Sequence, residues 1–188
     1  MRIYPLIAAL AVLFAAATPS QAPAQVESTP APAPKKPNFS SMEFMIGTWS
    51  CSTKSARRPA PYMSTVTFAM DPTGWWIEGT TATTPTKWFP TQSKLMTYDK
   101  ITYDSQTHRW IDVSYGSLAA ADLSVSTAGW NGNKFVWHSL TFAPTSDISS
   151  QTDNTITKVS NTKTTSSSSF TEAKTGRVVA VTGVCTKH

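Results

Sequence analysis

The sequence has few of the side chains that most often carry catalysis or bind metals, with two cysteines and three histidines in 188 residues. The histidines are His108, His138 and His188, and none belongs to a His/Cys cluster with the spacing that holds zinc. The Asp-x-Asp-x-Asp-Gly pattern of calcium loops and the Gly-x-Ser-x-Gly pattern of serine hydrolases are also missing. We therefore predict no catalytic residue, no metal ligand and no cofactor, and we do not expect an enzyme.

Charge and long apolar runs are also scarce, which excludes two further classes of protein. Charged residues make up 14% of the chain, and its net charge of +5 is scattered, with Lys54, Arg57 and Arg58 as the one tight basic group. Nucleic-acid binding favours a basic stripe interleaved with aromatic rings, so we expect no nucleic-acid partner. The apolar run over residues 6–17 is shorter than the roughly 18–20 residues that span a bilayer, so we expect no membrane span in the mature chain.

The same apolar run instead indicates export. It follows the positively charged start Met1-Arg2 and precedes small residues that end in Ala22-Pro23-Ala24, which is the pattern of a secretory signal peptide. We predict a signal peptide over 1–24, with cleavage after Ala17 as the alternative and a retained anchor helix as the competing interpretation. Residues 25–37 are rich in Pro and Ala and predict a disordered tether. Residues 38–188 then form one domain of a secreted or periplasmic protein.

Within this domain a short helical turn precedes a series of strands. Ser40 and Glu43 have the spacing of a capping box and predict a helical turn over 41–46, which Gly47 can end. No later window shows the apolar stripe of a helix. Asn131-Gly132 is the strongest short hairpin signal. Ten strands are predicted, over residues 48–55, 62–70, 75–83, 94–103, 108–115, 120–128, 134–142, 152–160, 165–172 and 177–186.

Ten consecutive strands with short connections predict an all-β fold with an up-and-down antiparallel sheet. A sheet of this length curls or splits, and closure into a barrel pairs its first strand with its last and leaves no exposed edge. Cys51 and Cys185 lie in those two strands and would become neighbours, so a disulfide between them fits an exported barrel. A β-sandwich also allows the two cysteines to meet, and two free thiols are the alternative.

These features carry a family likeness. The turn that runs into Phe44-x-x-Gly47-x-Trp49 resembles the start of lipocalin-like barrels. With the segments 102–110 and 130–137, the chain resembles an exported bacterial domain family of unknown function related to nitrobindin-type ten-stranded barrels. The resemblance implies a calycin-like barrel with an internal cavity, and haem held by a histidine late in the barrel. Residues 177–186 contain no histidine, so we do not expect haem.

Aromatic residues are abundant, with seven tryptophans in the chain. In an eight-stranded barrel the side chains just fill the interior, and a ten-stranded barrel is wider. Aromatic walls with a few polar groups are typical of apolar ligand pockets. Trp49 is expected to plug one mouth beside Gly47, and Trp88 with Phe89 to cover the other. The candidate pocket residues are Trp75, Trp76, Trp88, Phe89, Tyr98, Trp110, Tyr115, Phe135, Trp137 and His138.

Three functional hypotheses follow from this pattern. The first is a barrel that binds a small hydrophobic or amphipathic ligand, oriented by polar groups such as Tyr98, Tyr115 and His138. The second is an envelope interaction protein with a filled interior and an apolar outer patch. The third is an enzyme, which would need His138 to meet Glu78 or Asp112 inside the barrel. A buried carboxylate there would need a partner such as Arg109 or Lys100.

Overall fold

The computed structural model describes residues 33–87, 94–117, 121–140 and 148–188, and the account below concerns the unit Pro34–His188. Most of the predicted signal peptide and tether lies outside these ranges. The described elements are η1 (Glu43–Met45), β1 (Gly47–Ser55), β2 (Tyr62–Met70), β3 (Ile77–Thr83), β4 (Leu95–Asp104), β5 (Arg109–Gly116), β6 (Ala121–Ser126), β7 (Trp130–Asn131), β8 (Lys134–Ser139), β9 (Ile148–Gln151), β10 (Asn154–Ser160), β11 (Lys163–Glu172) and β12 (Val178–Lys187).

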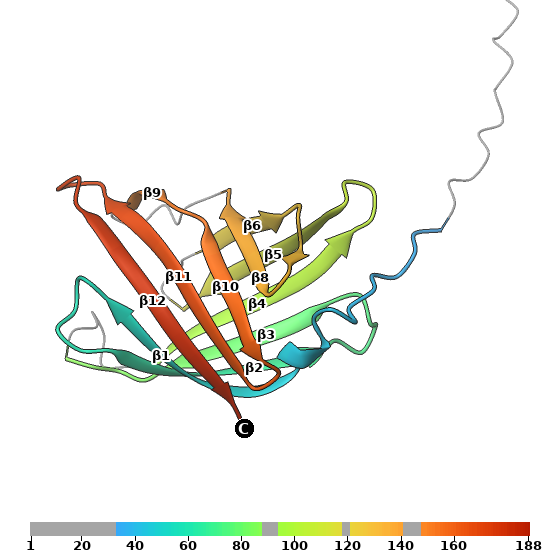
Figure 1. The fold of residues 1–188 in the computed structure, drawn as a ribbon, viewed down its shortest axis with the longest axis horizontal. Coiled ribbons are helices and arrows are strands. Elements are labelled where there is room, and N and C mark those ends of the chain that lie inside the picture. The colour runs from blue at the N-terminus through green and yellow to red at the C-terminus, as the bar shows by residue number, and fades with distance from the viewer. Residues whose placement is uncertain (1–32, 88–93, 118–120, 141–147) are drawn as a thin grey trace, which may run out of the picture. The chain divides into compact units, whose positions relative to one another are not determined.

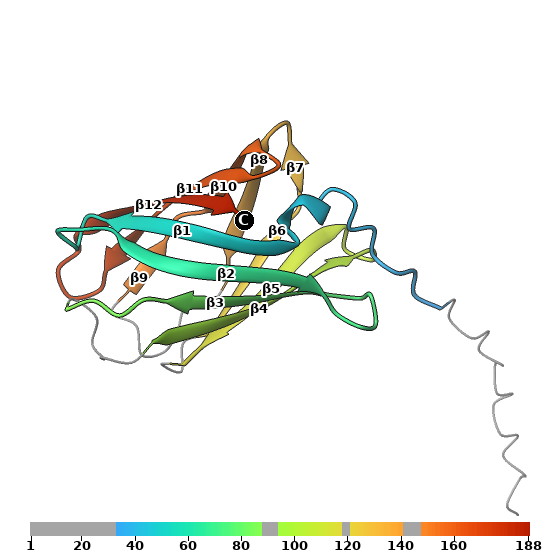
Figure 2. The same cartoon turned by 90° about the horizontal axis from the view of Figure 1, so that it is seen from below.

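Ten of these strands form a closed antiparallel barrel (Figures 1 and 2). The ring runs β1-β2-β3-β4-β5-β6-β8-β10-β11-β12 and closes where β12 pairs with β1. Cys51 stands directly opposite Cys185 in that pairing, and a disulfide joins them. The predicted closure of the first strand on the last is therefore confirmed.

Two short strands lie off the ring and were not predicted. β7 forms a hairpin with β8, in which Trp130 pairs with Phe135 and Asn131 with Lys134. The predicted turn is present, but its two connecting residues are Gly132 and Asn133, one position later than expected, and Gly132 has a positive φ of 61°. β9 pairs with β11 at the opposite end of the barrel. Both are too short to leave a period-2 apolar pattern in the sequence.

The strand predicted to begin at Trp75 begins at Ile77. The carboxylate of Asp71 accepts hydrogen bonds from the backbone N–H groups of Trp75 and Trp76, at 2.9 and 3.0 Å. These bonds hold both tryptophans in the β2–β3 turn, because an Asp side chain at the start of a turn competes with sheet pairing for the amides that follow it. Trp75 and Trp76 therefore precede β3, so the strand alternation behind the prediction of one inward ring does not apply to them, and neither lines the cavity described below.

A plug segment, residues 39–46, closes the end of the barrel where β1 begins and β12 ends. Its single 3₁₀ turn is preceded by Met42, not by the predicted capping box, and Met42 makes no side-chain capping bond. The backbone N–H of Ser40 donates to Asn38 Oδ1, so Asn38 forms the local turn instead. Phe39 and Met42 are buried with Ile77, Ile101, Trp110, Phe135 and Trp137 in the main apolar core.

Candidate ligand-binding cavity

A cavity of about 230 Å³ lies inside the barrel beside the plug segment. The wall combines rings and aliphatic side chains with a few hydroxyl and amide groups. It is formed by Phe44, Met45, Trp49, Cys51, Val66, Phe68, Thr81, Asn154, Ile156, Thr164, Ser166 and Cys185. Apolar walls with a few polar groups that fix orientation are typical of small-molecule sites, although this volume lies below the usual range of about 300–1,000 Å³.

Strand alternation explains why these residues meet. Successive side chains of a strand point to opposite faces, so Trp49 and Cys51 of β1 share the inner face. Val66 and Phe68 of β2 are the register partners of Trp49 and Gly47 and face the same way. Ile156 of β10 lies opposite Ser166 of β11, so both side chains face the interior on the neighbouring strands.

The plug segment forms one side of the cavity and is held there by hydrogen bonds. Trp49 Nε1 donates to the carbonyl oxygen of Met45 at 2.7 Å, and Lys187 Nζ donates to that of Phe44 at 3.0 Å. The Phe44 ring meets Trp49 and Trp130 edge-on, at centroid distances of 6.4 and 5.4 Å. Trp49 and Gly47 therefore lie at the closed end, Trp49 between the cavity and the plug segment.

Three of the predicted pocket rings are inside the barrel but do not line this cavity. Trp110, Phe135 and Trp137 pack on one another, with centroid distances of 6.2 Å for Trp110–Phe135 and 4.8 Å for Phe135–Trp137. They are buried in the core beneath Phe39 and Met42. These rings fill the β5–β8 side of the barrel, so the open volume lies on the side of β10–β12 and β1–β3.

Two predicted pocket tyrosines point away from the interior. Tyr98 and Tyr115 are 38% and 49% exposed and stack on each other on the outer wall, with centroids 5.2 Å apart. They pair across β4 and β5, where Asp99 and Ile101 occupy the alternate, inward positions. The prediction that these tyrosines orient a ligand inside the barrel is wrong because the register of β4 places even-numbered residues outside.

His138 is also on the outer wall, where its Nδ1 lies 2.7 Å from Asp153 Oδ1. Its neighbour Trp137 takes the inward position, so the predicted pocket role of His138 is wrong. Glu78 faces outward too and pairs with Lys100 at 2.8 Å. The remaining predicted pocket residues, Trp88 and Phe89, lie outside the described residues.

Carboxyl groups inside the barrel are the feature that sequence reasoning largely missed. Asp112 of β5 pairs with the core residue Ile101 and with Ser124, and therefore faces inward. Burial, reinforced by the nearby charges of Asp99 and Asp122, raises its pKa to about 8. Its Oδ1 is buried and has no hydrogen-bond partner among the described residues. Neither Arg109 nor Lys100 neutralises it, contrary to expectation.

The two other carboxyl groups of this wall differ in their surroundings. Burial raises the pKa of Asp99 to about 6. The Asp99 carboxylate has room because it packs over Gly79, where an added Cβ would lie 2.9 Å from Asp99 Oδ2. Asp122 accepts hydrogen bonds from Ser124 Oγ at 2.7 Å and Ser139 Oγ at 2.5 Å. The sequence does carry a signal for these inward polar residues. Polar side chains recur at every second position in Asp122-x-Ser124-x-Ser126, which places them on one face of the strand.

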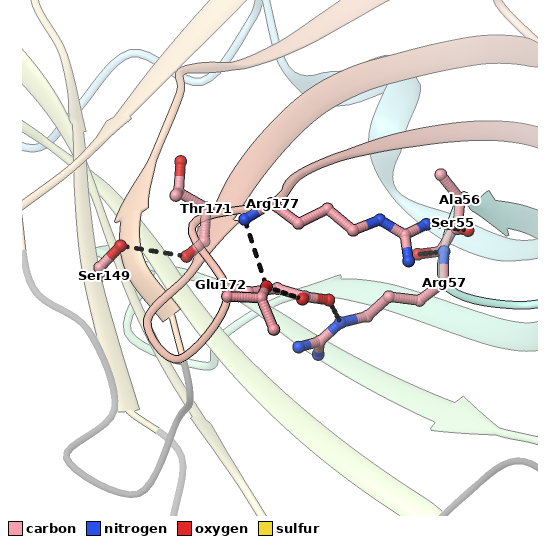
Figure 3. Close-up of polar contacts among 8 residues, drawn as sticks. Ser55, Ala56, Arg57, Ser149, Thr171, Glu172 and Arg177 are labelled. Carbon is pink, nitrogen blue, oxygen red and sulfur yellow. Dashed lines mark hydrogen bonds and ion pairs between the residues drawn. The ribbon is translucent and has the colours of Figure 1, made fainter.

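The mouth opposite the plug segment is held by a polar network (Figure 3). Arg57 Nε donates to Glu172 Oε1 at 2.6 Å, and an Arg177 guanidinium N–H donates to the carbonyl oxygen of Ala56 at 2.9 Å. The Arg57 guanidinium also lies 5.0 Å from the centroid of the Phe170 ring. These contacts tie the β1–β2 loop to the β11–β12 turn. Arg57, one of the three residues of the basic group noted in the sequence, therefore has a structural role.

Among the histidines of the described residues, His138 lies on the outer wall, and His188 Nε2 lies 2.6 Å from Ser50 Oγ. No group of three His, Cys, Asp or Glu side chains in the described ranges is arranged to hold a metal ion. Among the helices of those ranges, none is long and apolar enough to cross a membrane.

Comparisons with known proteins show the fold. No protein-family model matches the chain, and no curated protein matches it. Rv2717c from Mycobacterium tuberculosis is similar in structure, with a TM-score of 0.56, 13% identity, and coverage of 80% of this chain and 96% of that one. The S-type phycobiliprotein lyase CPES from Guillardia theta has a TM-score of 0.49 at 11% identity, covering 78% of this chain and 89% of its own. A protein of unknown function from the DUF3598 family of Nostoc punctiforme has a TM-score of 0.37 at 10% identity, covering 78% and 48%. At these identities the chain shares a barrel fold with Rv2717c.

Proposed function

We propose that this chain is an exported, non-catalytic barrel of the calycin type that binds a small hydrophobic or amphipathic molecule in its interior. The observation that carries the proposal is the cavity of about 230 Å³ that lies between the plug segment and the strands β10–β12 and β1–β3. A barrel evolved only as a rigid outer surface would gain stability by filling this space, since each unfilled methyl-sized void costs about 1 kcal/mol.

The placement of the reactive side chains supports binding over catalysis. His138 is paired with Asp153 on the outer wall, and the inward carboxyl groups of Asp99 and Asp112 have neither a histidine nor a lysine partner among the described residues. A general acid–base pair needs its members within hydrogen-bond reach of one another or of a shared substrate atom. Export is supported by the signal-like N-terminus and by the Cys51–Cys185 bridge, which suits an oxidising compartment.

The test compares two phenylalanine substitutions at positions on opposite faces of β2. Val66→Phe fills the cavity, whereas Thr65→Phe adds the same ring to the exposed outer face. We expect 1-octanol to bind the wild-type protein and Thr65→Phe with equal affinity in isothermal titration calorimetry. We expect Val66→Phe to bind at least tenfold more weakly, a change worth about 1.4 kcal/mol. Thermal melting checks that both variants are folded.

Equal octanol affinity in all three proteins would show that the cavity is not the binding site. Absence of octanol binding to the wild type would refute the proposed function. The natural ligand is then sought by native mass spectrometry of the protein purified from its own host, where a ligand-bound form has a discrete added mass that denaturation removes.

A further inference from the structure

The plug segment separates the cavity from a hollow on the outer surface. This outer hollow, of about 500 Å³, is bordered by Glu43 and Phe44 of the plug segment, by Lys158 and Asn161 near the β10–β11 turn, and by Lys187 of β12. Figure 1 shows η1 at this end of the barrel, beside the β10–β11 turn. Phe44 borders both the cavity and the outer hollow. Its side chain is therefore the partition between them.

Two lysine ammonium groups converge on that partition. Lys158 Nζ lies 4.2 Å from the centroid of the Phe44 ring. Lys187 Nζ lies 3.0 Å from the Phe44 carbonyl oxygen and 5.7 Å from the centroid of the Trp49 ring. Both side chains are half-buried, so apolar surface covers their stems while the charged ends remain at the hollow.

Neither lysine has a negative partner within the described part of the chain. Glu43 borders the outer hollow but forms no ion pair with Lys158 or Lys187 there. The contacts of both ammonium groups are instead a carbonyl oxygen and aromatic faces, which leave N–H donors available. Two partly desolvated cations without a counter-charge attract an anion more strongly than exposed lysines do.

A glycine leaves room for the Lys187 side chain. Gly47 has a φ of 122°, and a Cβ added there would lie 2.8 Å from Lys187 Cε. A side chain at position 47 would therefore meet the lysine stem that leads to the hollow. The glycine that lets the chain pass from the plug segment into β1 also makes room for this cation.

We propose that the ligand is an anionic amphiphile whose acidic head group binds in the outer hollow between Lys158 and Lys187. Its apolar part passes the Phe44 side chain, which acts as the gate, and fills the cavity. This inference rests on the proposed function, because it assigns the head-group site of a ligand whose apolar part occupies that cavity.

A positively charged ligand has weaker structural support than an anionic one. The carboxyl groups of Asp99 and Asp112 could attract an amine, but neither residue borders the cavity. Lysines 158 and 187, in contrast, contact two of the rings that form the cavity wall. The geometry therefore favours an anion.

The test uses three octyl compounds that differ in their head groups: octanoate, 1-octanol and octylamine. Binding to the purified protein is measured by calorimetry at neutral pH and followed by the fluorescence of tryptophan, since Trp49 lines the cavity. We expect octanoate to bind about tenfold more tightly than octanol, because a charge-assisted hydrogen bond is roughly twice as strong as a neutral one.

Paired variants assign this preference to the two lysines. In Lys158→Gln/Lys187→Gln, the ratio of octanoate affinity to octanol affinity should fall about tenfold, to about one. The ratio is the readout because Lys187 also holds the plug segment through Phe44, so its loss affects both affinities alike. Lys158→Arg/Lys187→Arg keeps the charge and should keep the preference. Lys54→Gln, which removes one positive charge on the exposed outer face of β1, should leave all three affinities unchanged.

The outcomes separate this inference from the proposed function. Equal binding of octanoate and octanol, or a preference that survives the double glutamine variant, would overturn the head-group site while leaving the cavity proposal standing. Tighter binding of octylamine would overturn it in favour of the carboxyl wall. Failure of all three compounds to bind would refute the proposed function itself.

Discussion

At the scale of single residues, Asp112 is the least expected feature of the barrel. A carboxyl group with a buried, unpartnered oxygen is costly when ionised, which is why its pKa is raised from 3.8 to about 8. The unfolded chain releases this proton near its ordinary pKa, whereas the folded chain retains it. The stability that the retained proton provides is fully present below about pH 4 and is lost as the pH rises through 8.

Replacing this carboxyl group by a neutral amide should remove that pH dependence. We expect Asp112→Asn to leave the free energy of unfolding unchanged near pH 4 and to raise it near pH 8 by at most about 5 kcal/mol, since the pKa is shifted by about four units and each unit is worth about 1.4 kcal/mol. Urea unfolding at several pH values measures this. Asp153→Asn, on the exposed outer wall, is the control. A variant whose stability still falls with pH as the wild type does would contradict the inward placement of Asp112.

Residue roles were the hardest part to predict from the sequence. Aromatic enrichment correctly indicated rings inside the barrel, and Trp110, Phe135 and Trp137 are buried there. The sequence does not distinguish a ring that fills a core from one that lines a void, because both are apolar and both alternate with polar neighbours. Tyr98 and Tyr115 show the related difficulty, since a register change of one residue exchanges the two faces of a strand.

At the scale of elements, strand positions could be predicted because period-2 patterns and turn residues are local signals. β2 was expected over 62–70 and has those bounds. β3 starts two residues after the predicted start because the Asp71 carboxylate accepts hydrogen bonds from the backbone N–H groups of Trp75 and Trp76. This contact depends on side-chain geometry, which a local sequence pattern does not show. The plug segment was expected from a capping box, yet its position depends on burial of Phe39 and Met42 against distant strands.

Burial should therefore dominate the stability of the plug segment. Met42 is 1% exposed and contacts the core, and Trp130 Nε1 lies 3.4 Å from its sulfur. We expect Met42→Ala to lower the free energy of unfolding by about 2–5 kcal/mol, the usual cost of truncating a buried methionine. Met63→Ala, at a 49% exposed position on β2, should change it by less than about 0.5 kcal/mol. Similar losses in chemical denaturation for both variants would show that the plug segment is not docked as described.

At the scale of the whole molecule, closure was the best-supported prediction. A sheet of ten strands either closes into a barrel or splits. A disulfide between the two cysteines, which lie 134 residues apart, favoured closure because it joins the first strand to the last. The strand order and the Cys51–Cys185 bridge agree with that reasoning. The position of the cavity was beyond sequence reasoning, because it depends on which side of a closed ring the core rings leave unfilled.

The central claim is that a ligand occupies the cavity beside the plug segment. Nuclear magnetic resonance of protein with labelled Ile and Val methyl groups, saturated with 1-octanol, tests this directly. We predict intermolecular contacts from octanol to the methyl groups of Val66 and Ile156, which line the cavity, and none to Val113, which is exposed on the outer wall. Contacts confined to Val113 and other outer-wall methyl groups, with none to Val66 or Ile156, would contradict the account.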